Sequence, residues 1–79
     1  MSPEEYAKRH QKAFRAAFDF LNAHFPPGDN LGWWDQVAKD CADVCDSMPG
    51  NTLIIGLLTG IMHYLEDEYK LRRKDDEEP

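Results

Sequence analysis

The chain has 79 residues and a net charge of −6, with 42% hydrophobic and 11% aromatic residues. This length allows one domain, and the apolar content excludes an intrinsically disordered chain. A domain of this size buries only about 60% of the surface of its unfolded chain, so self-association often adds stability to such domains.

The acidic charge is concentrated at the C-terminus, where Asp75, Asp76, Glu77 and Glu78 follow one another. Fifteen acids minus these four leave eleven, against nine Lys and Arg residues, so the rest of the chain is only mildly acidic. The basic cluster Arg72-Arg73-Lys74 adjoins the acidic tail. Direct nucleic-acid binding needs a basic surface, and we therefore predict none.

The N-terminal segment MSPEEYAKRH is charged and lacks the apolar stretch of a signal peptide. Two cysteines are too few for a secreted disulfide scaffold. We therefore expect a cytoplasmic protein with reduced thiols. The small size and the charged tail also suit an accessory protein of a bacterial phage or mobile element.

The first predicted helix spans residues 3–24. Ser2, Pro3 and Glu5 form a capping box with proline at the first helical position. At about 100° per residue, the apolar side chains share one broad face. His10 lies within this face and is predicted to be a core histidine. The face comprises Tyr6, Ala7, Ala13, Phe14, Ala17, Phe18, Phe20, Leu21 and Phe25.

The second predicted helix spans residues 32–47, after the loop FPPGDNLG, with Asp29 or Asn30 as its cap. One side is apolar, and Trp34 is predicted to lie inside the core while Trp33 packs at the end of the bundle. Cys41 and Cys45 fall on this apolar side without a CxxC motif, so we predict packing rather than metal binding. The opposite side carries Asp35, Asp40, Asp43 and Asp46.

The third predicted helix spans residues 52–73, with Asn51 as its cap. Its apolar segment LIIGLLTGIMHYL would extend over about 20 Å, which is short of the ~30 Å needed to cross a membrane. The apolar arc covers roughly 200°, more than a surface helix needs. We therefore predict that this helix mediates self-association, through Leu53, Gly56, Leu57, Gly60, Ile61 and Tyr64.

Together these elements predict an all-α fold, a small antiparallel three-helix bundle over residues 1–73, followed by a disordered charged tail at 74–79. No metal, phosphate or nucleophile motif is present, so we predict no enzyme activity, no catalytic residue and no cofactor. The preferred function is a protein–protein interaction module that forms a homodimer or binds another protein. The alternative is an acidic inhibitor whose Asp face binds the basic groove of a nucleic-acid enzyme.

Overall fold

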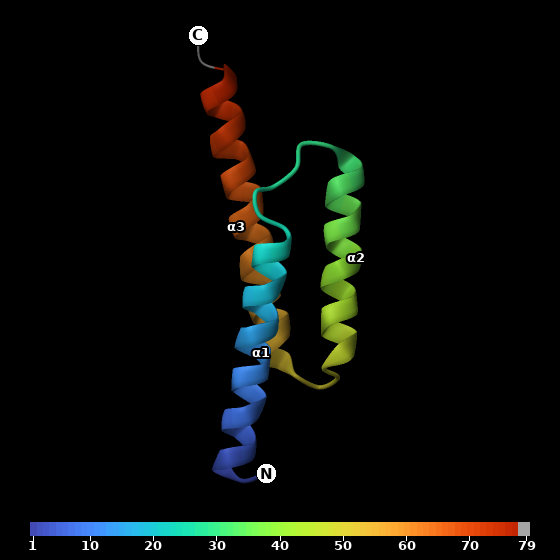
Figure 1. Ribbon diagram of the computed structural model, residues 1–79, viewed down its shortest axis with the longest axis vertical. Helices are drawn as coiled ribbons and strands as arrows, with labels where there is room; N and C mark the ends of the chain where they lie inside the picture. The colour runs from blue at the N-terminus through green and yellow to red at the C-terminus, as the bar shows by residue number, and fades with distance from the viewer. Residues whose placement is uncertain (78–79) are drawn as a thin grey trace.

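The computed structural model describes residues 1–77, with side chains described through Arg73, and contains three helices: α1 (Pro3–Ala23), α2 (Leu31–Ser47) and α3 (Thr52–Glu77) (Figure 1). No strand occurs within the described residues, which confirms the predicted all-α three-helix bundle. Helix α3 continues to Glu77, beyond its predicted end at residue 73. The remainder of the predicted tail, residues 78–79, lies outside the described residues.

The start of each helix is fixed by a side chain that accepts hydrogen bonds from the first backbone N–H groups, which have no partner within the helix. Ser2 Oγ accepts from Glu5 N at 3.2 Å at the start of α1. Asn30 Oδ1, rather than Asp29, caps α2 by accepting from Trp33 N at 2.8 Å. Asn51, which is buried, caps α3. The predicted caps are therefore confirmed.

Helices α1 and α3 run in the same direction, and α2 runs antiparallel to both (Figure 1). The closest packing joins α1 to α3, although α2 separates them in the sequence. Ala13 and Ala17, one turn apart on α1, are buried in the same cluster as Ile54 and Leu58 of α3. Small side chains on one helix allow the two helix axes to approach closely.

The core is a single cluster with most of its members on α1 and α3. Helix α2 contributes the buried Val37 and packs its aromatic end against α3, where the Trp34 ring lies 5.8 Å from the Tyr69 ring in an edge-on contact. Trp33 and Trp34 are half-buried, so Trp34 lies less deep than predicted. The buried hydrophobic residues are Ala13, Ala17, Phe20, Val37, Met48, Ile54, Leu58 and Leu65.

The bundle is elongated, with dimensions of 57 × 20 × 16 Å. Its radius of gyration is 15.0 Å, whereas a compact domain of this length would have about 12 Å. The cause is a stagger: the N-terminal turns of α1 project at one end and the C-terminal turns of α3 project at the other (Figure 1). Each projecting end lacks a neighbouring helix within the chain.

Candidate functional site

Helix α1 carries large apolar side chains outside the core. Phe14 and Phe18 are 56% and 61% exposed, although the sequence predicts them on the same apolar face as the buried Ala13 and Ala17. The core therefore contains only part of the predicted apolar face of α1. The apolar arc of α1 is wider than one neighbouring helix covers, and α3 packs against the alanine side.

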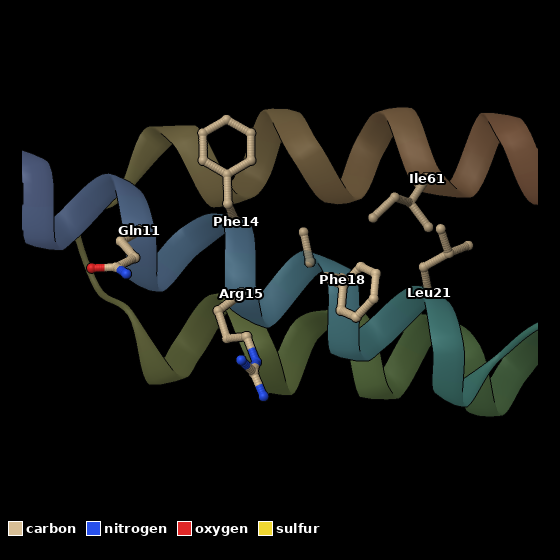
Figure 2. Close-up of a pocket in the computed structure, with 7 residues that line it drawn as sticks. Gln11, Phe14, Arg15, Phe18, Leu21 and Ile61 are labelled. Atoms are coloured by element: carbon tan, nitrogen blue, oxygen red, sulfur yellow. The ribbon is translucent and has the colours of Figure 1, made fainter.

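An open apolar groove lies between α1 and α3. Phe14, Phe18 and Leu21 from α1 line it together with Ile61 from α3 (Figure 2). The polar side chains of Gln11 and Arg15 lie at its margin. An apolar groove edged by polar side chains has the composition of a protein-binding surface.

Two further exposed aromatic residues lie at the end of the molecule where α1 stops. The Phe25 ring stacks on the Tyr64 ring at 6.0 Å, and the guanidinium of Arg72 lies 5.3 Å from the centre of the Phe25 ring. Both aromatic rings are more than one-third exposed. We call the whole region the apolar surface, and it comprises Phe14, Phe18, Leu21, Phe25, Ile61 and Tyr64.

The structure divides the six predicted interface residues of the third helix into two groups. Leu53, Leu57 and Ile61 are half-buried, whereas Gly56, Gly60 and Tyr64 are exposed. A Cβ atom added to either glycine would meet nothing within 4 Å, so packing inside the chain does not require these glycines. Ile61 and Tyr64 belong to the apolar surface.

The contribution of α1 was not predicted from the sequence, although a signal for it exists. The residues along the exposed side of α1 are spaced alternately four and three positions apart. This is the spacing of the contact positions in a coiled coil. This row, the α1 seam, comprises Ala7, Gln11, Phe14, Phe18 and Leu21, and the same spacing reaches Phe25 just after the end of α1. It lies beside the positions of Ala13, Ala17 and Phe20, which face the core.

The predicted acidic face of α2 is only partly available. Asp35, Asp43 and Asp46 are exposed. Asp40 is half-buried and accepts hydrogen bonds at 2.8 Å from His24 Nε2 and at 2.9 Å from Gln36 Nε2. The bond from His24 is the main cause that lowers the pKa of the Asp40 carboxyl, and the bond from Gln36 lowers it further. Asp40 is thus a structural residue.

His10 is exposed, and the prediction of a core histidine is therefore wrong. It lies next to Arg9, which donates a hydrogen bond to the carbonyl of Gly50, just before α3 begins, so little of α3 is available to cover it. Its ring lies 6.2 Å from that of Tyr6.

The two cysteines are half-buried and pack against the core, as predicted. Burial raises the pKa of the Cys41 thiol, and the neighbouring Cys45 raises it further, which lowers its reactivity. Among the side chains that the structure describes, which end at Arg73, no group of three or more His, Cys, Asp or Glu residues is arranged to hold a metal ion.

None of the three described helices carries an apolar stretch long enough to cross a membrane. Packing inside the chain does not explain the apolar surface, whose Phe14 and Phe18 side chains are more than half exposed. No protein-family model, curated protein or solved structure matches the chain.

Proposed function

We propose that the protein is a small non-catalytic interaction module that self-associates through the apolar surface of α1 and α3. The exposure of Phe14 and Phe18 beside the groove is the observation that carries this proposal. Single exposed apolar residues are ordinary, but a contiguous apolar groove usually marks contact with another protein. The interface predicted on the third helix shares Ile61 and Tyr64 with this surface, and the proposal extends it to α1.

The accessible area of the chain supports a dimer. The area is 5822 Å², whereas a folded monomer of 9.1 kDa would expose about 4,900 Å². The surplus of roughly 900 Å² is close to the ~800 Å² that each partner buries in a protein–protein interface of standard size.

A cytoplasmic location is part of the proposal. Both cysteines are free thiols. Reducing compartments maintain such thiols, whereas secreted domains of this size usually contain disulfides.

The test compares two variants that add the same charge at different apolar positions. Phe18→Glu places a carboxylate on the apolar surface, and Leu31→Glu places one at the start of α2, where Leu31 is 81% exposed. Light scattering coupled to size-exclusion chromatography, over micromolar concentrations, should show a dimer for the wild type and for Leu31→Glu. It should show a monomer for Phe18→Glu. Circular dichroism should show that both variants remain helical.

A monomeric wild type at the highest concentration would overturn the proposal. The same would follow if Leu31→Glu dissociated the dimer as completely as Phe18→Glu, because association would then not depend on the apolar surface.

A second candidate function is inhibition of a basic enzyme by α2. The exposure of Asp35, Asp43 and Asp46 on one helix supports it, because a row of carboxylates attracts a basic groove. Binding to nucleic-acid enzymes with basic grooves should weaken as salt rises and should be lost when all three residues are changed to Asn. The oligomeric state of that variant should match the wild type. Absence of salt-sensitive binding across a panel of such enzymes would contradict this candidate.

A further inference from the structure

The bundle has two projecting ends, and each leaves room for a helix of a second copy. At one end, Arg9 Nη2 donates to the carbonyl of Gly50, just before α3 begins, and the N-terminal turns of α1 project beyond the start of α3 (Figure 1). At the other end, Phe25 lies against Tyr64 and Arg72, so the part of α3 after Arg72 projects beyond α1. The two projecting ends point in opposite directions (Figure 1).

We propose that two copies dock antiparallel about a twofold axis near Ala16, so that the α1 seam of one copy lies against the α1 seam of the other. This inference rests on the proposed function, since it names the arrangement of the self-association proposed there. Each projecting α1 then lies beside the projecting α3 of the second copy. Both projecting ends gain a neighbour, as a closed twofold interface requires.

The side chains of the α1 seam favour antiparallel over parallel docking. An antiparallel pairing about Ala16 places Gln11 opposite Leu21 and Phe14 opposite Phe18. Phe25, which follows the end of α1, then lies near the level of Ala7. The small Ala7 then leaves room for the large Phe25 near the end of the interface, and the two phenylalanines of each copy meet next to the axis. A parallel pairing would place Ala7 opposite Ala7 and leave a gap, and it would place the amides of two Gln11 side chains opposite each other.

One pair of opposite charges, Glu4 and Arg72, favours the same direction. In the antiparallel pairing, Glu4 of one copy lies near the level of Phe25 and Arg72 of the other, and the two charges attract. In a parallel pairing, Glu4 would lie beside Glu4, and like charges across an interface oppose that arrangement. Glu4 is exposed, and Arg72 lies over the Phe25 ring at the edge of the apolar surface, with its Nε 3.9 Å from a carboxylate oxygen of Glu68 in the same helix.

Spin labels can distinguish the two directions. A nitroxide at Lys8→Cys, in a Cys41→Ala/Cys45→Ala background, marks an exposed position on α1. The antiparallel pairing places residue 8 opposite residue 24, so the two labels would be at least ~24 Å apart along the axis. A parallel pairing would bring them within about 15 Å. A pulsed dipolar measurement on the dimer should give the longer distance, and the shorter distance would overturn the antiparallel arrangement.

A charge-reversal pair gives a second test. Glu4→Lys should weaken the dimer by about threefold to tenfold, because two Glu4–Arg72 contacts form in each dimer. Adding Arg72→Glu to the same chain should restore at least part of the affinity. Glu66→Lys, which reverses an exposed charge elsewhere on α3, serves as the control and should leave the affinity unchanged. If the double variant dimerised more weakly than Glu4→Lys alone, this result would contradict the proposed contact.

The outcomes separate this inference from the proposed function. A wild-type protein that stays monomeric overturns both. A dimer that dissociates in Phe18→Glu but gives the short label distance supports the proposed function and overturns only the antiparallel arrangement.

Discussion

His24 links α1 to α2 through both nitrogens of its ring. Nε2 lies 2.8 Å from Oδ2 of Asp40, and Nδ1 lies 2.7 Å from the carbonyl oxygen of Phe20. Each ring nitrogen thus has an oxygen atom within hydrogen-bond distance, one from α1 and one from α2. The ring also packs against Phe20, with the two centroids 4.3 Å apart. A single side chain at the end of α1 therefore positions the middle of α2.

We expect His24→Ala to lower the free energy of unfolding by about 1–3 kcal/mol, because two hydrogen bonds and a ring contact are lost. Equilibrium unfolding in urea measures this change. His63→Ala, which removes an exposed histidine on α3, is the matched control and should change the stability by less than about 0.5 kcal/mol. Equal effects of the two substitutions would show that the His24 contacts do not stabilise the fold.

The stability should also depend on pH through Asp40. The pKa of this carboxyl is lowered in the folded state from its ordinary value of 3.8, first by the hydrogen bond from His24 and then by that from Gln36. Its stabilising contribution is therefore fully present above the unfolded pKa and is lost as the pH falls through the lower folded pKa. Urea unfolding at a series of acidic pH values should show a smaller acid-induced loss in Asp40→Asn than in the wild type. An unchanged loss would refute a role for Asp40.

Glycine-to-alanine substitutions should have opposite effects at two places. A Cβ atom at Gly28 would lie 2.5 Å from Cγ of Trp33, so Gly28→Ala should destabilise the protein by about 1–3 kcal/mol. At Gly56 a Cβ atom meets nothing within 4 Å, so Gly56→Ala should stabilise α3 by about 0.5–1 kcal/mol. Thermal unfolding followed by circular dichroism measures both changes. A rise in melting temperature for Gly28→Ala would contradict the packing of the loop on Trp33.

The cap of α3 should contribute more to stability than its exposed neighbour. Asn51 is 6% exposed, and its Oδ1 accepts hydrogen bonds from Leu53 N at 3.1 Å and Ile54 N at 3.3 Å. Asn51→Ala should therefore destabilise the protein by about 1–2 kcal/mol, whereas Asn51→Asp keeps the acceptor and should retain most of the stability. Thr52→Ala, at an exposed position, is the control in the same thermal unfolding experiment.

The helices could be predicted from the sequence because their starts depend on local chemistry. Ser2 and Asn51 bond to backbone groups within three residues of themselves, as capping residues do. The end of α3 was harder to predict, because a charged helical turn and a charged tail have similar compositions.

The exposure of Phe14 and Phe18 could not be predicted from the same pattern. Periodicity identifies an apolar side of α1, but it does not tell which part of that side a neighbouring helix covers. The answer depends on the close approach of α3 to Ala13 and Ala17. The hydrogen bond between His24 and Asp40 could not be predicted from the sequence pattern either, because the two residues come from different helices.

The close packing of the first helix on the last has a consequence for synthesis of the chain. While the ribosome is still adding α3, Ala13, Ala17 and Phe20 have no helix to cover them, since α2 packs less closely against α1. Bringing distant segments together costs chain entropy before the contacts between them can stabilise the fold. The domain therefore folds only when its last helix has emerged, and chains released before Leu65 would expose the core side of α1.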